Sequence, residues 1–109
     1  MNLAIFNKIV TDQMARSEQL LVGKGHEYAE NAESDSSIDR LAHFKKAAAL
    51  QDISPAEAAF GMLAKHLVSV SDMVRADKEH SLEKWEEKIS DSINYLLILR
   101  AIVEEGRAA

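Results

Sequence analysis

Cysteine is absent from the 109-residue chain, proline occurs once and glycine four times. A chain without cysteine has no disulfides, no thiolate metal site and no cysteine nucleophile. Because so few residues interrupt regular structure, we expect long unbroken elements, and the many alanine, leucine, glutamate and lysine residues favour helices. The length suits one hydrophobic core. The sequence therefore predicts a single all-α domain over residues 1–109.

The chain also lacks long apolar runs and an excess of basic residues. No segment approaches the roughly 18 apolar residues of a membrane-spanning helix, and Lys8 and Asp12 interrupt the apolar N-terminus too early for a signal peptide. We therefore expect a cytoplasmic protein with no membrane partner. The net charge of −5 argues against nucleic acid as the main partner, because phosphate contacts need clustered lysine and arginine. It is compatible with carboxylates gathered around a cation.

The first half of the chain contains two segments with helical periodicity. Apolar residues recur at steps of three and four over residues 3–21, which predicts a first helix. Residues 22–37 are less periodic and rich in polar residues, so we expect mostly loop. Within them, residues 26–32 either form a helical turn or continue the first helix after a break. Ser36 or Ser37 is expected to cap a short helix over about residues 38–50.

The second half predicts two longer helices. Ser54, Pro55 and Glu57 occupy the N-cap, first and third positions of a capping box, which starts a helix that runs to about Asp77. Its expected buried stripe comprises Ala59, Leu63, His66, Leu67, Val70 and Val74. The last helix is expected to start after Ser81 and to stop near Gly106, which suits the position after a helix end.

The short connection at residues 78–80 predicts that the two long helices pack antiparallel. We expect the first two elements to cover them, giving an antiparallel helical bundle of about four helices. Residues 96–99 of the last helix are all apolar, so that helix is apolar on more than one face. A chain this short cannot bury such a helix alone. The sequence therefore predicts a homo-oligomer, a dimer or a tetramer.

A polar stripe on the last helix is the first candidate site. Glu87, Asp91 and Asn94 follow one another at steps of four and three, so they share one side of the helix, with Tyr95 beside them. Two carboxylates and an amide on one side can bind a hard cation such as Mg²⁺. The alternative is a solvated charged face. Asp91 lies between apolar residues, so it is the carboxylate expected to face a partner helix.

Two further segments carry candidate residues, each with a plainer alternative. In the third helix, Lys65 and Asp72 lie seven residues apart, where Asp72 can complete a metal site and Lys65 can meet a phosphate. The alternative is an exposed pair beside a half-buried His66. In the segment around residues 24–30, Glu27 and Glu30 can share a helix face and Tyr28 can stack on a base. The alternative there is a polar connector.

Four stretches together resemble a known family. "KGHEYA", "DRLAHFKKAAAL", "SPAEAAFGMLAKHLVSVSDM" and "WEEKISDSINYLLILRAI" are similar, in this order, to small phage and prophage proteins of the MazG-like, all-α nucleotide pyrophosphohydrolase superfamily. The resemblance covers about residues 20–103. The matching positions are Lys24 and Tyr28, the central Lys65, and the Asp-Ser-Ile-Asn-Tyr step at residues 91–95.

The resemblance implies an oligomeric helical bundle that binds Mg²⁺ and splits a nucleoside triphosphate into the monophosphate and pyrophosphate. It implies a substrate contact for Lys65, Tyr28, Asn94 and Tyr95, and a catalytic role for Glu27 and Asp91. The implied metal ligands are Glu27, Glu30, Asp72, Glu87 and Asp91.

The chain departs from the family pattern in the last helix. Well-characterised branches carry an ExxD pair there, whereas Glu87 and Asp91 are four residues apart. Three hypotheses therefore stand together. The first is an Mg²⁺-dependent nucleotide pyrophosphohydrolase or nucleotide-binding protein, and the second is a non-catalytic helical interaction module with the same fold. The third, a nucleic-acid-associated accessory protein, is disfavoured by the acidic charge balance.

Overall fold

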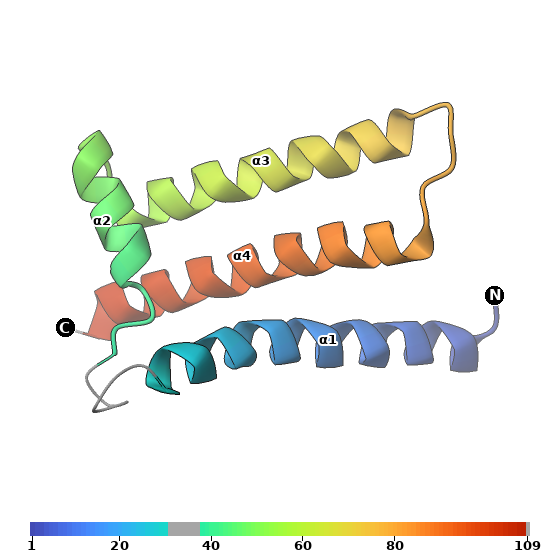
Figure 1. Ribbon diagram of the computed structural model, residues 1–109, viewed down its shortest axis with the longest axis horizontal. Coiled ribbons are helices and arrows are strands. Elements are labelled where there is room, and N and C mark those ends of the chain that lie inside the picture. The colour runs from blue at the N-terminus through green and yellow to red at the C-terminus, as the bar shows by residue number, and fades with distance from the viewer. Residues whose placement is uncertain (31–37, 109) are drawn as a thin grey trace. The chain divides into compact units, whose positions relative to one another are not determined.

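A computed structural model describes residues 1–30 and 38–108, with the side chains of residues 24–30 outside the description. Its described residues form four helices and no strand, which confirms the all-α prediction. The chain divides into two compact units, Met1–Ile38 and Asp39–Ala109. The first unit consists of helix α1, and the second contains α2, α3 and α4 (Figure 1).

Helix α1 spans Leu3–Glu30. Asn2 starts it, because its side chain accepts a hydrogen bond from the backbone N–H of Ile5 at 2.9 Å. The helix continues through Gly23 and Gly25, so the loop predicted for residues 22–25 is wrong. Over residues 26–30 the alternative that the first helix continues is confirmed, although no break precedes them. Each glycine costs a helix only about 1 kcal/mol, and the alanine and glutamate residues around them favour helix.

Helix α2 spans Ala42–Gln51, so it begins four residues later than predicted. The chain forms a turn first, in which the Asp39 carboxylate accepts a hydrogen bond from the backbone N–H of Leu41 at 2.9 Å. The proposed caps Ser36 and Ser37 lie outside the described residues. The helix ends at Asp52, whose φ of 55° and ψ of 46° place it in the left-handed region that commonly terminates helices.

Helix α3 spans Pro55–Arg75, and its predicted start is confirmed. The Ser54 hydroxyl accepts a hydrogen bond from the Glu57 N–H at 3.1 Å, and the Glu57 carboxylate accepts one from the Ser54 N–H at 3.3 Å. These reciprocal bonds satisfy donors that every helix N-terminus leaves free. The left-handed Asp52 and this cap lie two residues apart, so the chain changes direction sharply between α2 and α3.

Helix α4 spans Leu82–Ala108. Ser81 precedes it and accepts a hydrogen bond from the Lys84 N–H at 3.1 Å. The predicted stop near Gly106 is two residues early, and Gly106 is not the residue after the helix end. Gly106 has no positive φ, and the helix continues to Ala108 because nothing after the glycine breaks it.

The short connection from residue 76 to 81 turns the chain back, and α3 and α4 run antiparallel as predicted (Figure 1). Helix α2 crosses the end of this pair at which α3 begins and α4 ends (Figure 1). The buried apolar residues concentrate at this end, namely Leu41, Phe44, Ala48, Ala58, Ala59 and Leu63. Small alanines let α2 approach α3 closely. Of the predicted stripe, Leu67 and Val74 are exposed, because they lie one residue beyond the positions that face α4.

The described helices include none that is both long and apolar enough to cross a membrane.

Candidate functional site

The contact between α3 and α4 is polar at its centre. His66 of α3 lies against α4, with its Nδ1 atom 3.7 Å from Asp91 Oδ2. Its ring also stacks on the ring of Tyr95, with centroids 4.9 Å apart and planes inclined by 28°. The prediction that Asp91 faces a partner helix is therefore confirmed. This distance is longer than that of a hydrogen bond. The two side chains therefore attract each other only as an ion pair, which requires a protonated imidazole.

Helix α2 extends this cluster by one aromatic ring. Phe44 meets Tyr95 edge to face, with centroids 6.2 Å apart and planes at 84°. Phe44 is buried, while Tyr95 and His66 are half-buried. The rings thus form a row from the apolar core towards Asp91. The position of Tyr95 is fixed, because its ring packs against both Phe44 and His66.

Four of the predicted site residues share one face of the α3–α4 pair, which we call the polar face. In α3, Lys65 and Asp72 each precede a position turned towards α4, namely His66 and Met73. In α4, Asn94 precedes Tyr95, and Glu87 lies two turns before Asn94 on the same side. One residue turns a helix by about 100°. In each helix the site residues are thus rotated by one residue from the positions that face the other helix. Because the helices are antiparallel, this rotation places the site residues of α3 and those of α4 on the same side of the pair.

The register between the helices sorts these residues into two levels. His66 contacts Asp91 and Tyr95, which sets Lys65 of α3 level with Asn94 of α4. The same register sets Asp72 level with Glu87. The two levels are two helical turns apart, about 10 Å. The polar face therefore carries two carboxylates at one level and a cation with an amide at the other. Asp91 lies at the contact between α3 and α4, which we call the seam, at a height between these two levels.

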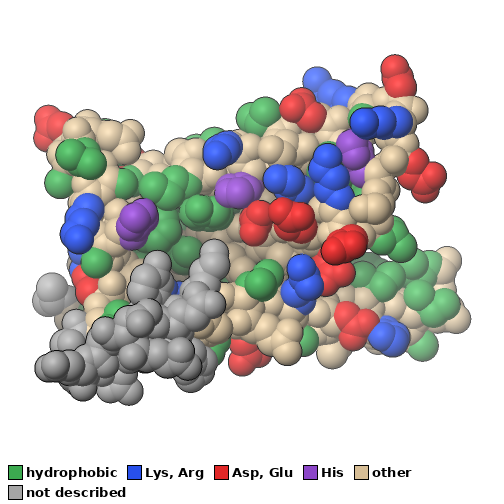
Figure 2. Space-filling view, in the orientation of Figure 1, with side chains coloured by type: hydrophobic (Ala, Val, Ile, Leu, Met, Phe, Trp, Pro, Cys, Tyr) green, Lys and Arg blue, Asp and Glu red, His purple; other side chains and the backbone are tan. Residues whose placement is uncertain are grey.

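The charges on this face are open to solvent. Lys65, Asp72 and Glu87 are exposed, and none of them forms an ion pair with another side chain that the structure describes. Figure 2 shows the change of character along the pair: hydrophobic side chains lie towards α2, and a histidine with acidic and basic side chains follows along the middle of α3 and α4. The arrangement leaves these groups available to a ligand.

Asn94 adds an acceptor to the same region. Its residue is half-buried, yet its Oδ1 atom is buried and accepts no hydrogen bond from the described part of the chain. A buried acceptor left unpaired costs about 1–3 kcal/mol. A ligand donor at this atom would remove that cost.

Other predicted residues fall outside what the structure describes. Glu27, Tyr28 and Glu30 belong to the last turns of α1, but their side chains are not described. Among the described residues, no three acidic or histidine side chains are grouped closely enough to hold a metal ion. Mg²⁺ needs fewer protein ligands when it arrives with a nucleotide, because it keeps several waters and takes the rest from phosphate oxygens. Asp72, Glu87 and Asp91 offer suitable oxygen donors for that mode.

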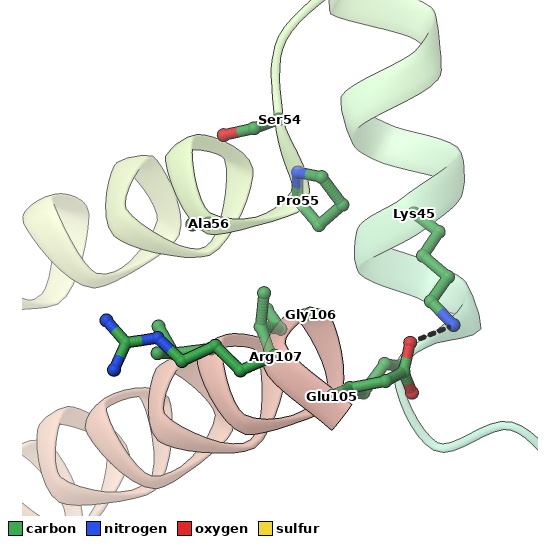
Figure 3. Close-up of a pocket in the computed structure, with 10 residues that line it drawn as sticks. Lys45, Ser54, Pro55, Ala56, Glu105, Gly106 and Arg107 are labelled. Carbon is green, nitrogen blue, oxygen red and sulfur yellow. Dashed lines mark ion pairs between the residues drawn. The ribbon is translucent and has the colours of Figure 1, made fainter. Parts of the chain in front are cut away.

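A pocket of about 360 Å³ lies elsewhere, where α2, the start of α3 and the end of α4 meet (Figure 3). Its walls are mainly apolar, and none of the predicted site residues lines it. Lys45 on its rim forms ion pairs with two acids. Its Nζ atom lies 2.7 Å from Glu105 Oε1 (Figure 3) and 2.7 Å from Asp39 Oδ2. These bonds raise the pKa of Lys45, first through Asp39 and then through Glu105. The hydrogen bond from Lys45 lowers the pKa of Asp39, and the hydrogen bond from the Leu41 N–H is the next cause. The pocket is thus part of the packing at a helix junction.

The sequence predicted a structural role for His66 and no site role for Phe44. The signal for His66 was present in its spacing, because it lies in register with the buried Ala59 and Met73. Phe44 had no comparable signal, since its contact with Tyr95 depends on how α2 crosses the pair.

Comparisons of the chain with protein-family models, curated proteins and solved structures found no match. The resemblance to MazG-like proteins therefore remains a prediction from the sequence motifs.

Proposed function

We propose that the protein binds a nucleoside triphosphate with Mg²⁺ on the polar face and splits it into the monophosphate and pyrophosphate. The observation that carries the proposal is the position of Asp91 at the seam, next to His66 and between the two levels of polar residues. The MazG-like motifs support the same activity, because the residues they single out in α3 and α4 share this face.

The two levels suit the two ends of the substrate. The carboxylates of Asp72 and Glu87 would hold Mg²⁺ together with phosphate oxygens and water. When bound, Mg²⁺ neutralises the phosphates and stabilises the charge that develops as the bond breaks. Lys65 lies at the Asn94 level, so its mobile point charge suits the α-phosphate, which is the phosphate next to the sugar. Asn94 and Tyr95 lie about 10 Å from the carboxylate level, where they can meet the sugar or base.

The reaction itself needs one base and one water. In the proposed step Asp91 accepts a proton from the water as the water oxygen attacks the α-phosphorus. The bond from that phosphorus to the bridging oxygen then breaks, and pyrophosphate leaves with the electron pair. His66 lies beside this base, with its Nδ1 atom 3.7 Å from Asp91 Oδ2. The resemblance adds Glu27 and Glu30 as further ligands or base and Tyr28 as a base contact.

The test is pyrophosphate release by the full chain, with Mg²⁺ and a panel of common and base-modified nucleoside triphosphates. We expect monophosphate and pyrophosphate in equal amounts for at least one substrate. Asp91→Asn should lower the rate about 100-fold or more, since general-base catalysis contributes that much. Asp77→Asn is the matched control, because it removes an equal charge from an exposed position outside the polar face.

The non-catalytic module makes the opposite prediction. If no triphosphate yields pyrophosphate and none raises the melting temperature in the presence of Mg²⁺, the activity is absent and the module hypothesis is favoured. If a nucleotide binds but is not split, the protein is a nucleotide-binding protein with a reduced site. Thermal shift and product analysis on the same samples separate these results.

A further inference from the structure

Apolar residues continue the polar face from the level of Lys65 and Asn94 towards α2. In α3, Gly61 lies four residues before Lys65, and in α4, Ile98 lies four residues after Asn94. Residues four apart lie on one side of a helix and about 6 Å apart along its axis. Because the helices are antiparallel and Lys65 is level with Asn94, Gly61 and Ile98 lie level with each other, one turn nearer to α2.

The same relation holds one turn further on. Ala58 lies seven residues before Lys65 and Ala101 lies seven residues after Asn94, so these two alanines are also level with each other. Ala101 is exposed, whereas Ala58 is only 4% exposed. Helix α2 crosses this end of the pair, and its Phe44 ring packs on α4 (Figure 1). The stretch of the face between Lys65 and α2 is therefore bounded by α2.

Four residues form the floor of this stretch, which we call the apolar platform: Gly61, Met62, Ile98 and Ala101. Gly61 and Ala101 are exposed, while Met62 and Ile98 are half-buried. A Cβ atom added at Gly61 would meet no other atom within 4 Å, so the space above this residue is open. The side chains of these four residues carry no charge and no hydrogen-bond donor. Figure 2 shows hydrophobic side chains between α2 and the charged middle of the pair.

We propose that the apolar platform holds the base of the nucleotide and binds it by apolar contact. This inference rests on the proposed function, in which the leaving pyrophosphate lies at the level of Asp72 and Glu87 and the α-phosphate lies at that of Lys65. The α-phosphorus is bonded to the pyrophosphate on one side and to the sugar on the other. The nucleoside therefore extends away from the carboxylates, with its sugar beside Asn94 and its base one turn nearer to α2.

An apolar platform selects a base by its size rather than by its hydrogen-bonding pattern. A site that hydrogen-bonds a group of the substrate rejects an analogue without that group by a factor of about 10⁴ or more, whereas a hydrophobic surface discriminates far less. The substrate class that we infer is therefore broad. It consists of purine nucleoside triphosphates, which offer the largest base, including those whose base has lost or gained an exocyclic group.

The first experiment measures KM of the full wild-type chain with Mg²⁺ for three triphosphates. They are ATP, purine riboside triphosphate, which lacks the exocyclic amino group, and ribose 5-triphosphate, which lacks the base. The KM values of the first two should agree within about three-fold, because only hydrogen bonds are removed. The KM of ribose 5-triphosphate should be about 10-fold higher or more, because the contact with the base is lost.

The second experiment repeats these measurements with a carboxylate on the platform, in Ala101→Glu and in Gly61→Glu. The ratio of KM for ribose 5-triphosphate to KM for ATP should fall from about 10 towards about 1 in each variant. The ratio isolates the base, because both substrates carry the same phosphate charge. Glutamate favours a helix more than glycine does, so Gly61→Glu is expected to fold. Ala49→Glu is the matched control, since this exposed alanine lies five residues after Phe44, on the other side of α2.

The outcomes separate this inference from the proposed function. If ATP is split and ribose 5-triphosphate has the same KM, the platform does not hold the base, although the proposed function stands. The inference is also overturned if purine riboside triphosphate has a KM about 100-fold above that of ATP, since the base is then recognised by hydrogen bonds. Two folded glutamate variants that keep the wild-type ratio, or a chain that splits only pyrimidine triphosphates, have the same consequence.

A chain that binds nucleotides without splitting them allows the same comparisons with dissociation constants in place of KM. A chain that neither binds nor splits any triphosphate overturns the proposed function and this inference together.

Discussion

The α3–α4 pair has two halves of different construction. The capped half, residues 54–63 with the end of α4, contains the capping box, the crossing by α2 and most of the buried apolar side chains. The polar half, residues 65–73 with residues 87–95, contains His66 and Asp91 at its seam and exposed charges on one face. Burial of apolar area stabilises a fold, whereas a partly exposed ion pair contributes little. The residues that stabilise the fold and the residues of the candidate site therefore occupy different lengths of the same helices.

The largest expected loss of stability comes from a substitution in the core of the capped half. Leu63→Ala removes a side chain that is 2% exposed and leaves a cavity, so the free energy of unfolding should fall by about 2–5 kcal/mol. Urea denaturation followed by circular dichroism measures it. Leu50→Ala is the control, because Leu50 is 89% exposed and its loss should change stability by less than about 0.5 kcal/mol. Equal effects for the two variants would contradict the description of this half as the core.

A smaller effect is expected in the polar half. Asp91→Asn keeps the shape of the side chain and removes its charge, and the pair with His66 is partly exposed and 3.7 Å apart. The free energy of unfolding should therefore change by less than about 1 kcal/mol in either direction. Measured beside the loss of pyrophosphate release, this result would separate function from stability. A loss of about 3 kcal/mol or more would instead identify Asp91 as a structural ion-pair partner.

The smallest effect concerns the bridge of Lys45 to Asp39 and Glu105. The lowered pKa of Asp39 means that its stabilising contribution is present at neutral pH and is lost as the pH falls through that pKa. The raised pKa of Lys45 means that its contribution is lost as the pH rises through the raised value. Melting temperatures of the wild type and of Lys45→Met, compared from acid to alkaline pH, should differ most near neutrality. A constant difference would show that the bridge contributes no pH dependence.

Local signals in the sequence predicted much of the fold. The capping box at Ser54 combines three residue types whose roles depend only on neighbours in the chain, so it could be identified directly. The glycine signal at Gly106 failed. Gly106 lies inside α4, because a glycine ends a helix only where the following residues also favour leaving it. The start of α2 was misplaced because the turn at Asp39 depends on its bonds to Leu41 and Lys45.

The candidate site was predicted in part, because helical spacing shows which residues share one side of a helix but not how two helices are aligned. Spacing correctly assigned Asp91 to a helix contact, and it placed Lys65 and Asp72 on one side of α3. It could not show that Glu87 and Asn94 share a face with them, because that depends on the register between two helices. It also assigned Leu67 and Val74 to the buried stripe, although both lie one residue past the positions that face α4 and are exposed.

The connection of residues 76–81 between α3 and α4 has a consequence for the order of folding. It is short, so the helices meet soon after both have formed, and the entropy lost on closing the loop is small. Helical domains dominated by such local contacts fold within microseconds to milliseconds. We expect the hairpin to form first and α2 to fold onto its capped end afterwards. The polar face, which both of these helices build, would then form in a single early step, before α2 is in place.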